Sequence, residues 1–125
     1  MSREERTGVR DLTLSAWHRS LPDLCTCIDL DFLEYCNKCR APLALIETAR
    51  GHHNQIKPTT VLKALAEHAG LRAYLVLYDI DETAPYRISP NVRVQRIAPN
   101  KSELRVMPLA EFGRCIESVH RAHQC

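Results

Sequence analysis

The chain of 125 residues is long enough for one domain with a single hydrophobic core. Hydrophobic residues make up 45% of it and charged residues 26%, a balance that is typical of a folded protein and argues against disorder. The formal charge of +2 is too small to indicate a nucleic-acid binder by itself. No apolar run reaches the roughly 20 residues that a membrane-spanning helix needs, so we expect no membrane partner.

The N-terminal residues, Met1 to Arg6, are polar and lack the apolar core of a signal peptide. We therefore expect a cytoplasmic protein with a flexible arm over residues 1–8 and a single domain over residues 9–125. In that compartment the six cysteines should be reduced thiols or metal ligands rather than disulfides.

The first half of the chain predicts a helix followed by a β-hairpin. Apolar residues recur at helical spacing from Leu14 to Leu21, and Pro22 ends this helix. The chain from Cys25 to Tyr35 is apolar and extended in character, and a polar turn over residues 36–42 leads to a second apolar run at residues 43–46. These features predict two antiparallel strands joined by a long turn.

The second half predicts a helix, a buried strand and a β-β-α extension. The helix begins at a cap on Thr59 or Thr60 and ends at Gly70. Residues 73–78 are almost wholly apolar, as expected of a strand that is buried on both faces. The last elements are two short strands and an amphipathic helix, at residues 92–97, 103–107 and 109–119. The order α-β-β-α-β with a C-terminal β-β-α extension predicts an α/β fold, a mixed sheet flanked by helices.

Three acidic residues of the predicted hairpin form the first candidate site. Asp29 and Asp31 are two residues apart, so their side chains share one face of a strand. If the turn is centred on Cys39, Asp31 is directly opposite Glu47, with Cβ atoms roughly 5 Å apart. Carboxylates at this distance repel unless a proton or a cation lies between them. The sequence therefore predicts a Mg²⁺ or Mn²⁺ site, and the alternative is a solvated strand face.

The hairpin and its neighbours resemble the core of the PD-(D/E)XK, or restriction-endonuclease-like, nuclease superfamily. The resemblance rests on Asp31, on the apolar run Ala44-Leu45-Ile46 directly before Glu47, and on the helix and buried strand that follow, over about residues 11–79. It implies a restriction-endonuclease-like core and hydrolysis of phosphodiester bonds in DNA with a Mg²⁺ or Mn²⁺ cofactor. By position, Asp31 and Glu47 would be catalytic metal ligands, assisted by the carbonyl of Thr48. Small members of the superfamily often act as dimers, which implies a homodimer here.

The chain departs from the family pattern at one position. The family's lysine falls at Ala49, whose methyl group can neither orient a water molecule nor stabilise a developing negative charge. Lys57, Lys63 or Arg50 could take over this role. Two interpretations stay open: an active endonuclease or exonuclease, and a non-catalytic nucleic-acid- or protein-binding module on a nuclease-derived fold.

Basic residues gather in one late segment of the chain, which is either a solvated face or a surface that follows phosphates. Arg50 and three arginines of this segment are the candidates for backbone contacts without sequence specificity: Arg93, Arg96 and Arg105.

A second candidate site is the turn Cys36-Asn37-Lys38-Cys39, whose two thiols are spaced as in a zinc knuckle. A structural zinc site needs four protein ligands, so this pair alone is not a site. Cys25 and Cys27 are the nearest further cysteines, but Cys27 and Cys36 would lie roughly 30 Å apart along one strand. The other sources are a second copy of the chain or later residues: His52, His53, Cys115, His120, His123 and Cys125. The pattern leaves two interpretations, reduced thiols at a hairpin tip and a zinc-stabilised regulatory protein.

Overall fold

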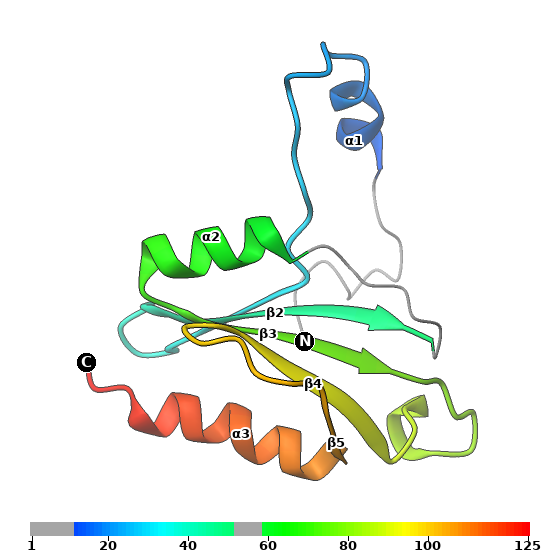
Figure 1. Ribbon diagram of the computed structural model, residues 1–125, viewed down its shortest axis with the longest axis vertical. Coiled ribbons are helices and arrows are strands. Elements are labelled where there is room, and N and C mark those ends of the chain that lie inside the picture. The colour runs from blue at the N-terminus through cyan, green and yellow to red at the C-terminus, as the bar shows by residue number, and fades with distance from the viewer. Residues whose placement is uncertain (1–11, 52–58) are drawn as a thin grey trace.

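The computed structural model describes residues 12–51 and 59–125 (Figure 1). The predicted arm over residues 1–8 lies outside this range, as do Lys57, His52 and His53. The elements are α1 (Thr13–His18), β1 (Phe32–Tyr35), β2 (Pro42–Arg50), α2 (Thr60–Ala69), β3 (Arg72–Tyr78), the 3₁₀ turn η2 (Pro85–Arg87), β4 (Asn91–Ala98), β5 (Arg105–Pro108) and α3 (Leu109–Ala122). The predicted order of helices and strands is confirmed.

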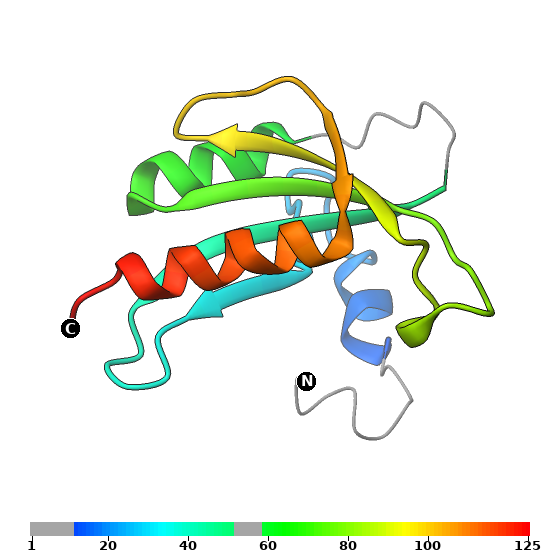
Figure 2. The same cartoon turned by 90° about the horizontal axis from the view of Figure 1, so that it is seen from below.

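The strands form one mixed sheet in the order β1-β2-β3-β4-β5. Strands β2 and β3 are parallel and joined through α2, and the other neighbours are antiparallel. Figures 1 and 2 show α2 and α3 on opposite faces of this sheet, which we call the α2 face and the α3 face. The protein is therefore an α/β fold with a five-stranded mixed sheet flanked by helices, and the narrower restriction-endonuclease-like core remains a prediction.

The core has one apolar layer on each face of the sheet. The buried residues of the α2 face are Leu45, Leu62, Ala66, Ala73, Leu75, Ile97 and Ala98. Those of the α3 face are Ile46, Val76, Val92, Val94 and Phe112. Strands β2 and β3 contribute side chains to both layers, because successive residues of a strand point to opposite faces. Burial of β3 on both faces, as its continuous apolar run predicts, is confirmed.

The helix ends follow the local sequence closely. Helix α2 starts directly after Thr59, although no side-chain hydrogen bond caps it, and ends at Gly70, whose φ is +68°. This left-handed conformation favours glycine and lets Leu71 N–H donate to the carbonyl of Ala66 at 2.9 Å.

Two predicted elements are longer than the observed ones. The strand expected from Cys25 to Tyr35 is formed over Phe32–Tyr35 only. Just before it, Asp31 Oδ2 accepts the backbone N–H of Thr48 at 2.8 Å, so this N–H is not available to a carbonyl of an extended β1.

Helix α1 has six residues, none of them buried, and Figure 1 shows it standing away from the sheet. The predicted helix from Leu14 to Leu21 is therefore confirmed in its position, but it ends three residues earlier than expected. In the part of the chain that the structure describes, no helix combines the length and apolar character needed to cross a membrane.

Candidate functional site

The acidic end of the β1–β2 hairpin has the register that a turn centred on Cys39 predicts. Phe32 lies opposite Ile46 and the pairing ends there, so the predicted opposition of Asp31 and Glu47 falls one position beyond the ladder. The Asp31 carboxylate does not point freely outward, because Oδ2 accepts both the N–H of Thr48, at 2.8 Å, and the Thr48 hydroxyl, at 3.0 Å. These two bonds fix Asp31 against the edge of β2, one residue beyond Glu47.

Glu47 is buried on the α2 face of the sheet. It pairs in register with Leu75, a member of the α2-face core, and is 5% exposed. Among residues 12–51 and 59–125 it is the one buried polar or charged residue, and a carboxylate at such a place requires compensating interactions. Asp29, Asp31 and Glu47 do not come together as a group of three metal-ligating side chains among these residues.

The predicted substitutes for the missing lysine lie in different surroundings. Ala49 pairs with Leu77 and places no functional group next to Glu47. Lys63 lies on α2 with its Nζ atom 3.9 Å from Glu67 Oε1, and both side chains are about half exposed. Lys57 lies outside the described residues.

Arg50 ends β2 and is exposed to solvent. The Arg87 guanidinium, bound to Glu82 through contacts of 2.8 and 2.7 Å, is the main cause that lowers the pKa of Glu82, and the charge of Arg50 adds to it. Arg50 therefore lies toward the loop that precedes β4.

The arginines expected to contact a phosphate backbone do not share one face of the sheet. Arg93 pairs with Leu77 of the α2 face, whereas Arg96 pairs with Tyr74 of the α3 face. Arg105 is on the α3 side with Arg96, because it faces a residue of that core layer. Arg93 and Arg96 also donate to backbone carbonyls at 2.8 and 2.7 Å. Arg93 and Arg96 are three residues apart on one strand, so the regular alternation of side chains is enough to place them on opposite faces.

A cluster of three cysteines and one histidine lies at the other end of the hairpin. Cys36 and Cys39 come from the β1–β2 turn, and His123 and Cys125 come from the segment that follows α3. Their ligand atoms all lie within 4.8 Å of one another. The Sγ atoms of Cys36 and Cys125 are 3.5 Å apart, and Cys39 Sγ is 3.1 Å from His123 Nε2. Figures 1 and 2 show the turn and the end of the chain side by side.

The turn has a backbone conformation that stabilises a thiolate. Arg40 has a φ of +68° and donates its N–H to the carbonyl of Cys36 at 2.9 Å, while Cys36 N–H donates to the carbonyl of Ala41 at 2.9 Å. The backbone N–H groups of Cys39 and Lys38 are directed at the Cys36 sulfur, and they lower the pKa of Cys36 to about 6. Cys36 is thus prepared to ligate a metal at neutral pH.

The end of α3 reaches the turn through a hydrogen bond between His120 and Glu34 and through a change of backbone direction. His120 Nε2 lies 2.8 Å from Glu34 Oε1 and ties the last turn of α3 to β1. The helix ends at Ala122, and His123 has the extended angles φ −79° and ψ 136°. This change of direction carries His123 and Cys125 toward the hairpin turn.

The thiol of Cys125 resists ionisation while its neighbours carry negative charge. Sharing of its proton with Cys39 and with Cys36 raises the pKa of Cys125 to about 11, and partial burial and repulsion by the two thiolates act in the same direction. A cation placed among these sulfurs removes the repulsion.

The sequence named all four members of this cluster but could not select two of them. His123 and Cys125 were two of six candidates for completing the knuckle, and the H-x-C spacing was the available signal. Cys27 is elsewhere, with its Sγ atom 3.5 Å from His18 Nδ1, and Cys115 is exposed on α3 outside the cluster.

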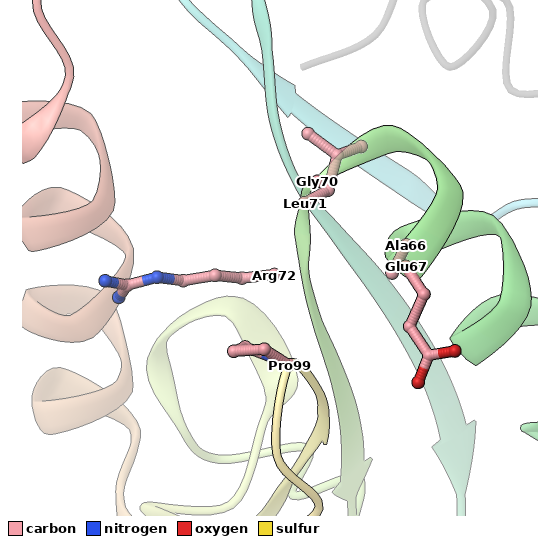
Figure 3. A pocket seen from close by; sticks show the side chains of 6 residues that line it. All are labelled: Ala66, Glu67, Gly70, Leu71, Arg72 and Pro99. Atoms are coloured by element: carbon pink, nitrogen blue, oxygen red, sulfur yellow. The ribbon is translucent and has the colours of Figure 1, made fainter.

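Two shallow hollows lie near the turn between α2 and β3. The larger, of about 380 Å³, is shown in Figure 3 and is lined by Ala66, Glu67, Gly70, Leu71, Arg72 and Pro99. In Figure 3 the Arg72 side chain extends toward α3, away from Glu67. The smaller hollow, of about 250 Å³, shares Arg72 with it and includes His123. Neither hollow includes Asp31 or Glu47.

Comparisons of the chain with protein-family models, with curated proteins and with solved structures found no match.

Proposed function

We propose that the protein is a nuclease-like protein that hydrolyses phosphodiester bonds in DNA at a site formed by Asp31 and Glu47. The observation that supports this proposal most is the burial of Glu47, which is only 5% exposed and directly precedes Thr48, the residue that binds the Asp31 carboxylate. Burying a carboxylate in a sheet costs free energy and does not stabilise the fold by itself. Ionisable residues in such surroundings are enriched at functional sites.

The donors fit a hard divalent cation. Asp31 and Glu47 offer carboxylate oxygens, which Mg²⁺ and Mn²⁺ prefer, and Thr48 holds Asp31 Oδ2 in place through two hydrogen bonds. A bound ion would supply charge neutralisation at the phosphate and a lower pKa for its bound water.

Cationic side chains would orient the attacking water and stabilise the developing negative charge. Lys57 remains a candidate, on sequence grounds, for the role of the lysine that Ala49 replaces. Arg50 is a weaker choice, because it pairs with Tyr78 of the α3 face, whereas Glu47 is on the α2 face. Lys63 is also a weaker candidate, because Glu67 already neutralises it. Arg93 is the one of the three predicted backbone-contacting arginines that shares the face of Glu47. We expect slow, sequence-independent cleavage, since no lysine adjoins Glu47 in the family position.

A second candidate function is a non-catalytic nucleic-acid-binding module on the same sheet. Ala49 and the Lys63–Glu67 pair favour it, because both reduce the positive charge available to a developing oxyanion. The two functions make different demands on the acids, since binding to a phosphate backbone does not require Asp31 or Glu47.

The test compares the wild type with an Asp31→Asn/Glu47→Gln double variant, which keeps the side-chain shapes and removes the charges. Asp23→Asn, at an exposed position outside the strands, is the matched control. Plasmid, single-stranded and branched DNA are incubated with each protein in Mg²⁺ or Mn²⁺. We expect cleavage by the wild type and the control only.

Cleavage at the same rate by the double variant would identify a contaminant and reject the nuclease proposal. DNA binding without cleavage in all three proteins would favour the second function. Absence of both binding and cleavage would reject both.

A further inference from the structure

We propose that Cys36, Cys39, His123 and Cys125 bind one structural Zn²⁺ ion, which fastens the β1–β2 turn to the end of α3. The proposal is independent of the acidic site, because the two lie at opposite ends of the hairpin. It rests on the convergence of four ligand atoms from two segments far apart in the sequence.

The spacing of the donors agrees with a tetrahedral zinc site. Sulfur and nitrogen ligands at roughly 2.3 and 2.0 Å from one zinc ion lie about 3.5 to 3.8 Å from each other. The contacts Cys36–Cys125 at 3.5 Å and Cys39–His123 at 3.1 Å are close to these edges. Small movements of exposed side chains are enough to complete the geometry.

The chemistry of the donors selects zinc over the hard cations. Thiolates and an imidazole are soft or borderline ligands that favour Zn²⁺, whereas Mg²⁺ and Ca²⁺ take oxygen ligands. Three thiolates, one neutral histidine and one Zn²⁺ ion give a net charge of −1. Lys38 and Arg40, which flank Cys39 in the turn, lie close enough in sequence to offset it.

The backbone of the turn already surrounds one of the proposed ligand atoms. The turn folds around the Cys36 sulfur, because the backbone N–H groups of Cys39 and Lys38 are both directed at it. A disulfide between Cys36 and Cys125 is a different state, because it needs the two sulfurs at about 2.05 Å and they are 3.5 Å apart.

The role of the ion follows from where its ligands are anchored. Strand β1 is at the edge of the sheet and none of its four residues is buried, so apolar packing holds this part of the hairpin weakly. Helix α3, by contrast, is fixed to the sheet through buried Phe112 and Val119. Four protein ligands leave no open position for a substrate, which makes the site structural and not catalytic.

The test uses the full-length untagged chain, kept reduced and exposed to zinc before dialysis. Elemental mass spectrometry should find about one zinc ion per chain. Added Co²⁺, a spectroscopic probe for the same site, should give the visible bands of a tetrahedral thiolate complex.

Cys125→Ser and His123→Ala should weaken zinc binding by more than about tenfold, because each removes one of four ligands. Cys115→Ser is the matched control, since Cys115 is exposed on α3 and lies outside the cluster. His123→Cys should restore binding, which separates loss of a ligand from loss of folding.

Three results would overturn the proposal. These are wild-type protein with zinc far below one ion per chain, a Cys125→Ser variant that binds as tightly as the wild type, and a Cys115→Ser variant that loses as much zinc as Cys125→Ser. None of these outcomes depends on DNA cleavage, so the acidic site and the zinc site can fail separately.

Discussion

The two ends of the β1–β2 hairpin carry different kinds of site. At the acidic end, Asp31 directly precedes β1 and binds Thr48 of β2, the residue after Glu47, so the whole arrangement lies within one hairpin. At the cysteine end, Cys36 and Cys39 meet His123 and Cys125, which are separated from them by more than 80 residues of sequence. The first arrangement needs only a correct hairpin, whereas the second needs the whole fold, because α3 must pack before its last residues can reach the turn.

The difference also affects what each site contributes to stability. A buried carboxylate on the α2 face is a cost that its surroundings must offset. The proposed zinc ion would instead join two segments that the hydrogen bond between Glu34 and His120 already connects. We therefore expect zinc to stabilise the cysteine end of the hairpin strongly and to leave the stability of the acidic end nearly unchanged.

Removal of zinc should have the largest effect and should be confined to one end. With a chelator present, residues 36–42 and 120–125 should lose protection from hydrogen exchange, while residues 44–48 keep theirs, because β2 is buried between β1 and β3. The unfolding midpoint should rise again by roughly 5 °C for each tenfold increase in free zinc above the dissociation constant. Hydrogen exchange and thermal unfolding at several zinc concentrations measure both effects.

An equal change in protection at both ends would show that the ion acts on global unfolding and not on the turn. No change at either end would contradict the role of the metal as a fastener. Magnesium added to the chelated protein is the control, since it should not restore the protection.

Substitutions in the two hairpin strands should separate their contributions to the core. Leu45 of β2 is 2% exposed in the α2-face layer, so Leu45→Ala should lower the free energy of unfolding by about 3 kcal/mol. Leu33 of β1, its partner in register, is 48% exposed, and Leu33→Ala should cost less than about 1 kcal/mol. Urea unfolding of zinc-saturated protein gives both values.

Equal losses for the two variants would mean that β1 is anchored by packing. Zinc would then contribute little to the stability of β1. The proposal that β2 is held by packing and β1 by the zinc ion would be wrong.

The sequence predicted the local features well and the long-range ones poorly. The hairpin register, the glycine end of α2 and the burial of β3 all depend on residues close together in sequence, and all are confirmed. The length of β1 was wrong because the Asp31 side chain occupies a backbone N–H of β2, a contact that no propensity records. The predicted end of α1 was wrong by three residues, because helical spacing of apolar residues does not fix where a helix without buried side chains ends.

The cysteine cluster shows the same limit more sharply. The C-x-x-C spacing predicted two of the four ligands of a metal site, but six further residues were candidates for the other two. Only the packing of α3 through Phe112 and Val119 selects His123 and Cys125. The acidic pair, in contrast, was predicted from local sequence alone, and its metal and its activity both remain predictions.

The pH dependence of the metal-free protein should be the smallest effect, because both thiols involved are close to solvent. Cys36 has a pKa of about 6 in the folded state against 9.0 when unperturbed, so the unfolded chain binds more protons between these values. Stability should therefore rise from pH 6 to pH 9. Cys125 is shifted the other way, to about 11, so the folded state binds more protons above pH 9 and stability should fall from there to pH 11.

Urea unfolding of chelated, reduced protein across this pH range would give a maximum near pH 9. A Cys36→Ser variant should lose the rise below pH 9 and keep a smaller fall above it, because Cys39 is the main cause that raises the pKa of Cys125 and Cys36 adds to it. The same experiment on zinc-loaded protein tests whether the cysteine end of the hairpin is the source of this pH dependence. Bound zinc keeps the cysteines deprotonated, so the maximum should disappear. If the maximum persists with zinc bound, the titrating groups belong to another part of the molecule, and the preparation of the turn for a metal would lose its support.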